Sequence, residues 1–110
     1  MKDPITFAEY DKVEVRVGTI AQAIVPEGSE KLIQFTVDFG SETRTIFSGI
    51  KEWYTPEELF GVKTLWVTNI PPKKTPFGES QGMLFACDSR EGKPYIVKVD
   101  ESVENGSMFH

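Results

Sequence analysis

An apolar stripe with a period of two residues constrains the fold more than any other feature of the sequence. Between residues 33 and 39 every second residue is large and apolar; the stripe consists of Ile33, Phe35, Val37 and Phe39. The residues between them are mostly polar, so a strand with one buried face is predicted here. The nine glycines recur mostly at intervals of about ten residues, which is typical of short strands joined by turns. The sequence therefore predicts an all-β domain.

Five further stretches are predicted to be strands. They cover residues 13–25, with a bend at Gly18, and residues 43–50, 63–70, 82–88 and 94–100. These strands fit a five-stranded Greek-key barrel of the OB-fold type, with terminal extensions. An SH3-like barrel fits the strand count almost as well, and periodicity does not choose between the two.

One short helix is predicted between the strands at Thr55-Pro56-Glu57-Glu58. Thr55 can cap the free amides, Pro56 suits the first helical position, and Glu58 can complete a capping box. The hydrophobic content of 39% over 110 residues suffices for one core. Residues 1–110 are therefore predicted to form one domain, and small domains of this size often gain stability by oligomerising.

Few residues are suited to catalysis or to metal binding. The one histidine, His110, is the last residue, and a terminal side chain is rarely held in place. Cys87 is the one cysteine; it lies in a predicted strand, where we expect a buried, inert thiol. Glu57 and Glu58 are explained by their place in the first turn of a helix. The sequence therefore predicts a chain that is not an enzyme and that holds no cofactor and no metal ion.

The segment 69–83 is the most informative part of the chain for function. It leaves a predicted strand through Pro71 and Pro72, which stiffen the backbone and hold Lys73 and Lys74 in fewer conformations. With two lysines and Glu79 the segment has a net charge of +1, whereas the whole chain has -5. Ammonium, hydroxyl and amide groups suit a sugar-phosphate backbone, although an ordinary solvated loop would have the same composition.

A second group of polar residues is expected on the neighbouring strands. Arg44 and Ser48 have the same parity in their strand and should face the same side, and Lys31 begins the strand beside them. Arg44 could bind phosphate, or it could pair with a carboxylate such as Glu42 or Asp38. Among the aromatic residues Phe77 is a candidate for stacking on a base.

Four blocks of the sequence resemble the tRNA-binding domain family. They are residues 27–32 (EGSEKL), 44–50 (RTIFSGI), 69–74 (NIPPKK) and 80–84 (SQGML), and the resemblance extends from about residue 7 to the end of the chain. The family includes a C-terminal domain of bacterial methionyl-tRNA synthetases, a free-standing beta subunit of that enzyme and stand-alone tRNA-binding proteins. The resemblance implies an OB-fold that binds tRNA by its shape as a homodimer, without acylating it.

Site residues are carried over from the resemblance by position. The candidates for contact with RNA are Lys31, Arg44, Ser48, Asn69, Lys73, Lys74, Ser80, Gln81, Gly82 and Met83. For Met83 a half-buried strand residue is an equal alternative to an apolar contact. The resemblance also implies that the flanks 1–12 and 94–110 supply the dimer contacts, and it allows a methionyl-tRNA synthetase catalytic subunit as a partner.

The acidity of the chain leaves an alternative function open. A related branch of the fold acts as an export chaperone-like module that binds peptides, and such a role tolerates a net charge of -5 better than RNA binding does. The lysine pair and the block 80–84 favour the tRNA-binding branch. The sequence has no apolar run of membrane-spanning length, and residues 1–10 lack the apolar region of a signal peptide, so we expect a cytoplasmic protein without membrane contact.

Overall fold

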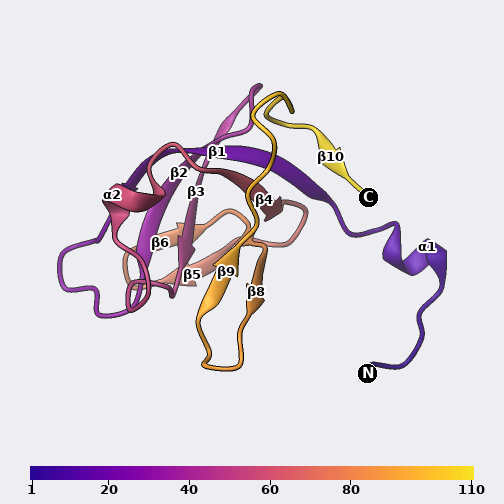
Figure 1. Ribbon diagram of the computed structural model, residues 1–110, viewed down its shortest axis with the longest axis horizontal. Coiled ribbons are helices and arrows are strands. Elements are labelled where there is room, and N and C mark those ends of the chain that lie inside the picture. The colour runs from indigo at the N-terminus through magenta and orange to yellow at the C-terminus, as the bar shows by residue number, and fades with distance from the viewer.

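A computed structural model describes all 110 residues as an all-β barrel with two short helices (Figure 1). The elements are α1 (Phe7–Tyr10), β1 (Val15–Ile24), β2 (Ile33–Asp38), β3 (Thr43–Ser48), α2 (Pro56–Leu59), β4 (Lys63–Val67), β5 (Lys73–Thr75), β6 (Gly78–Ser80), β7 (Met83–Leu84), β8 (Ala86–Asp88), β9 (Pro94–Ile96) and β10 (Met108–Phe109). Neither helix is long and apolar enough to cross a membrane.

The main sheet has the Greek-key order β3-β2-β1-β4-β7. β1 is the long central strand. Its first half pairs with β4 and its second half pairs with β2. The short strand β10 pairs with the first two residues of β1, Val15 and Arg16. The chain curls this sheet until β7 and the end of β6 lie against β3, where the Gln81 amide donates to the Thr45 carbonyl at 2.8 Å. The sheet is thereby nearly closed, which confirms the predicted OB-like barrel over the SH3-like alternative.

The apolar stripe of β2, which continues to Phe39 just after the strand, forms the centre of the barrel core. Its four residues are all buried, as the alternating pattern predicts. Trp66 of β4 packs edge-on against both Phe35 and Phe39, and its indole donates to the Gly18 carbonyl at 3.0 Å. The indole N–H is therefore satisfied inside the core, and Trp66 has the structural role that its place in mid-strand indicates.

Gly18 has a different role from the one predicted for it. The irregularity of β1 lies between Ile20 and Gln22, not at Gly18. A Cβ atom at Gly18 would lie 2.6 Å from Cγ1 of Val37 and 2.9 Å from Cε1 of Phe39. Glycine is needed here because the core side chains of the neighbouring strand approach the backbone closely.

The predicted helix forms where its capping signals lie. The Thr55 hydroxyl accepts from the Glu58 amide, and the Glu58 carboxylate accepts from the Thr55 amide, so both halves of the capping box are present. Leu59 at the end of α2 is buried in the core cluster. The helix thus covers one end of the barrel, with Gly61 in the positive-φ region directly after it.

Two strand predictions are wrong in their extent. Residues 82–88 form two short strands, because β7 pairs with β4 whereas β8 pairs only with β9. Residues 97–100 run past the barrel without strand pairing. The β8–β9 hairpin projects from the barrel in Figure 1, and all three residues of β8 are exposed. Cys87 is consequently exposed, which corrects the expectation of a buried thiol.

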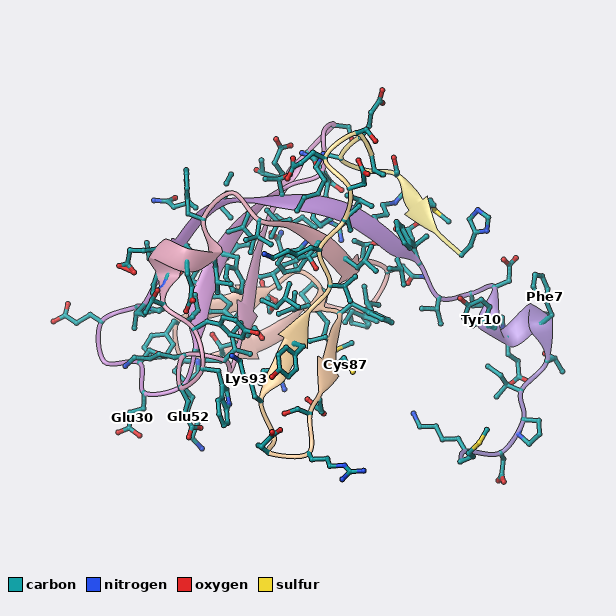
Figure 2. The ribbon with its side chains drawn as sticks, viewed as in Figure 1. Phe7, Tyr10, Glu30, Glu52, Cys87 and Lys93 are labelled. Carbon is teal, nitrogen blue, oxygen red and sulfur yellow. The ribbon has the colours of Figure 1, made fainter.

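The N-terminal residues 1–13 lie outside the barrel and are all exposed. They include α1, which has no buried residue although it carries a complete capping box between Thr6 and Glu9. Phe7 points away from the barrel in Figure 2, whereas Tyr10 lies on the side of α1 nearer to the barrel; Phe7 is 79% exposed and Tyr10 49%. This arm therefore presents apolar side chains that the chain itself does not cover.

Candidate functional site

The segment predicted to be a loop contains a two-stranded hairpin. β5 and β6 pair with each other in a sheet of their own, with Lys73 opposite Ser80 and Lys74 opposite Glu79. Lys73 and Lys74 are exposed, and neither makes an ion pair or a side-chain hydrogen bond. Both ammonium groups are therefore free to bind an anion from solvent.

The C-terminal end of this hairpin is joined to β3 by its own side chains. The Ser80 hydroxyl accepts from the Phe47 amide and donates to the Gly82 carbonyl, both at 3.0 Å, and Ser80 is buried. The Gln81 side-chain oxygen accepts from the Thr45 amide at 2.8 Å, next to the Gln81 backbone bond to the same residue. The two polar residues predicted for RNA contact therefore also extend the hydrogen bonding of the β3 edge.

The N-terminal end of the segment is joined to the start of β1. The Asn69 side chain accepts from the Glu14 amide at 2.8 Å and donates to the Lys12 carbonyl at 2.6 Å. Next to it the Thr68 amide donates to the Glu14 carbonyl at 3.0 Å, and the Thr68 hydroxyl donates to the Glu14 carboxylate at 2.5 Å. Asn69, a further RNA-contact candidate, thus also fastens the chain that leads into β1.

Arg44 lies between these two ends. Its Nη1 donates to the Thr68 carbonyl at 2.6 Å and to the Gln81 carbonyl at 3.2 Å. Its Nε and Nη2 donate to one carboxylate oxygen of Glu42 at 3.2 and 3.0 Å. Of the two alternatives left open by the sequence, the structure forms the pair with Glu42.

The remaining predicted site residues differ in exposure. Lys31 is exposed and Ser48 half-buried; Ser48 lies opposite Ile33 in the β2–β3 pairing, two residues from Lys31. Met83 is 49% exposed although it belongs to a strand of the barrel. Gly82 is buried with a φ of 148°, and a Cβ there would lie 2.9 Å from the Val67 carbonyl oxygen.

Most of the predicted residues lie in segment 69–83 or, like Arg44, bond to its ends, whereas Lys31 and Ser48 make no hydrogen bond to it. By exposure, the candidates form two groups. The exposed group consists of Lys31, Lys73, Lys74, Gln81 and Met83; of these, Gln81 also accepts an internal hydrogen bond from Thr45. The second group is engaged in internal hydrogen bonds or close packing, and consists of Arg44, Asn69, Ser80 and Gly82. Glu14 and Thr68 were not predicted to belong to this region, because nothing in a strand pattern shows that the two side chains meet.

The ionisation of Glu14 depends on this arrangement. A hydrogen bond from Arg16, and after it one from Thr68, holds the pKa of the Glu14 carboxyl below its usual value of 4.5. The carboxylate therefore stays charged at neutral pH and can keep accepting from Thr68. No three His, Cys, Asp or Glu side chains come together as a metal site would need.

Comparison with known proteins supplies the context for this site. A family model described as a putative tRNA binding domain matches residues 15–108. Methionine--tRNA ligase of Caldanaerobacter subterraneus is 45% identical over 107 residues, which are 97% of this chain and 17% of the relative. Methionine--tRNA ligase of Nitrosomonas eutropha is 38% identical over 94% of this chain and 15% of the relative. The chain thus spans about one sixth of the length of these curated relatives.

Solved structures show the same fold. The crystal structure of a MetRS related protein from Pyrococcus horikoshii superimposes with a TM-score of 0.94 at 38% identity, and covers 99% of this chain and 100% of that one. The chaperone CsaA of Bacillus anthracis superimposes with a TM-score of 0.87 over 98% of this chain and 100% of that one. Its identity of 23% supports a likeness of fold alone.

Proposed function

The chain belongs to the tRNA-binding domain family, and on that premise we propose that it binds folded tRNA as a homodimer and catalyses no reaction itself. The observation that carries the proposal is the free pair of ammonium groups on Lys73 and Lys74. They project from a hairpin whose two ends are hydrogen-bonded to the barrel, so little conformational freedom is lost when phosphate binds.

The charge distribution supports recognition of a backbone at one place on the molecule. The body of the chain is acidic and repels RNA, whereas the β5–β6 hairpin presents two lysines against Glu79. A protein that recognises the shape of a folded RNA needs few contacts with bases, because the phosphates of the RNA have fixed positions in space. Such binding is modest for one protomer and depends strongly on salt.

A homodimer would double this footprint on the RNA. The exposed arm supports it, because the apolar side chains of Ile5, Phe7 and Tyr10 have no cover within the chain. The edge of β10 lies near the root of that arm, since Val15 pairs with Phe109. We infer that residues 1–12 and 94–110 form the contact between two copies. Sedimentation equilibrium of the whole chain tests whether the dimer forms, and the same measurement on Phe7→Ser tests whether the arm takes part in the contact.

The similarity to methionine--tRNA ligases suggests where the chain acts. The matched part is a small fraction of each relative, so we propose an accessory role in the cytoplasm: presenting tRNA to a methionyl-tRNA synthetase catalytic subunit, or holding it in trans. Co-purification of a synthetase with the chain would support the first of these two roles.

Peptide binding is the competing function, and the acidic surface with exposed Met83, Phe85 and Tyr95 favours it. A pull-down with and without ribonuclease separates the two. An RNA-binding chain loses its RNA-bridged partners after ribonuclease treatment, whereas a peptide-binding module keeps its polypeptides.

The lysine pair is tested by a salt titration of tRNA binding to the variant Lys73→Gln/Lys74→Gln. Removing one lysine–phosphate pair lowers the magnitude of the slope of log K against log[salt] by about 0.7–0.9, so removing two lowers it by about 1.4–1.8 per protomer and by about 2.8–3.6 for a dimer that engages both hairpins. Affinity at fixed salt should fall by about tenfold or more. The matched control is Arg90→Gln/Lys93→Gln, which removes two positive charges from the turn between β8 and β9, outside the hairpin and the proposed dimer contact, and should leave the slope nearly unchanged. Equal behaviour of the two variants would contradict the proposed site.

A further inference from the structure

The hydrogen bonds of Arg44 occupy almost the whole guanidinium group. Nε, Nη1 and Nη2 all donate within the protein: two of them to Glu42, and Nη1 to two backbone carbonyls. The Glu42 carboxylate compensates its positive charge at 3.0 Å. A phosphate could form a bidentate contact with Arg44 only after some of these bonds were broken, so a direct contact with RNA is a poor use of this residue.

The two carbonyls that Arg44 joins belong to Thr68 and Gln81. These residues stand immediately before and after the segment 69–80, which carries the lysine hairpin. One guanidinium nitrogen therefore connects the point where the segment leaves the barrel to the point where it returns. A two-stranded hairpin is only marginally stable alone, and fixing its ends close together removes the entropy of loop closure.

We propose that Arg44 is a positioning residue for tRNA binding, which closes the base of segment 69–80 and thereby holds Lys73 and Lys74 in their binding arrangement. This inference rests on the proposed function for its effect on RNA, but its structural half can be measured without RNA. In this proposal Arg44 does not contact phosphate itself but holds in place the lysines that do.

The test compares Arg44→Gln and Arg44→Lys with Arg90→Gln, which removes an exposed arginine that makes no side-chain hydrogen bond. Hydrogen exchange is measured on the amides of β5 and β6, and those of β1 and β2 report whether the barrel stays folded. Both Arg44 variants should exchange faster in β5 and β6 and keep the protection of β1 and β2. Arg90→Gln should match the unsubstituted chain.

Salt-titrated tRNA binding then separates positioning from contact. Without Arg44, the two lysines of each hairpin lose conformational freedom when RNA binds, so tRNA affinity should fall by about tenfold in both Arg44 variants. The slope of log K against log[salt] should stay unchanged, because both lysines still reach their phosphates. Arg44→Lys is decisive, because it keeps the charge but cannot reach both carbonyls and Glu42 together. It also replaces Arg44→Gln in the comparison if that variant does not fold.

Two results would overturn the proposal. One is a slope whose magnitude falls by about 0.9 per protomer in Arg44→Gln and is restored in Arg44→Lys, which identifies a phosphate contact. The other is unchanged exchange of β5 and β6 in both variants. Failure of the proposed function looks different: the unsubstituted chain then binds no tRNA, while the exchange measurement still decides whether Arg44 holds the segment.

Discussion

Gly18→Ala tests how closely the core packs against β1. The added Cβ would lie 2.6 Å from Cγ1 of Val37 and 2.9 Å from Cε1 of Phe39, whereas carbon atoms in contact lie about 3.5–4.0 Å apart. Val37 and Phe39 are both buried, and Phe39 is packed against Trp66. A shift of about 1 Å is therefore needed in side chains that have no free space around them.

Moving the backbone instead of the side chains is also costly. The Gly18 carbonyl accepts the Trp66 indole N–H at 3.0 Å, and a retreat of β1 would stretch this buried bond. Overpacking of this kind costs about 1–3 kcal/mol, and part of it is offset by the smaller entropy of the unfolded alanine chain. We expect the free energy of unfolding to fall by about 2 kcal/mol, which corresponds to a Tm lower by about 8 °C.

Urea denaturation at one fixed protein concentration measures this loss, since dimerisation would otherwise change the apparent stability. Gly49→Ala is the matched control, because Gly49 has no positive φ and an added Cβ there meets nothing within 4 Å. The control should be neutral or slightly stabilising. If Gly18→Ala loses less than about 0.5 kcal/mol, the argument from close approach is wrong.

Two further predictions concern buried and partly buried polar groups. The buried Thr64 hydroxyl has no hydrogen-bond partner, so Thr64→Val should raise the free energy of unfolding by about 1 kcal/mol; a loss of stability in urea denaturation would show that the hydroxyl is satisfied. Arg16 and then Thr68 lower the pKa of Glu14 from 4.5, so Glu14 contributes stability above that value, and the contribution is lost as pH falls through its folded pKa. The stability difference between the unsubstituted chain and Glu14→Gln should therefore shrink below about pH 4.5, and a difference that stays constant from pH 7 to pH 3 would contradict the role of the carboxylate.

The barrel strands and α2 could be predicted because the residues within each of these elements form a recognisable pattern. The alternation along β2 fixes which residues are buried, and the Thr55–Glu58 capping box fixes where α2 begins. The position of Cys87 could not be predicted in the same way. Whether a short strand belongs to the barrel or to a separate hairpin depends on its partner, and β8 pairs with β9 instead of β4.

For the candidate site residues, the sequence predicted the exposure of the lysine pair but not the hydrogen bonds that the other candidates form. Lys73 and Lys74 are exposed as expected, because nothing in the fold pairs with them. The bonds of Arg44 join residues that are 24 and 37 positions away in sequence. Parity along a strand gives the side to which Arg44 points, but it carries no information on which carbonyls the closed barrel places opposite it.

The separate β5–β6 sheet has a consequence for how the protein can change. Its outward residues take no part in the barrel core, whereas Ser80 and Gln81 fasten its end to β3. Under the proposed function, mutations at the tip would alter ligand preference while folding is left to the barrel. Hairpins with different tip sequences could therefore be carried by the same barrel, provided that the residues that bond the two ends of the hairpin to the barrel are kept.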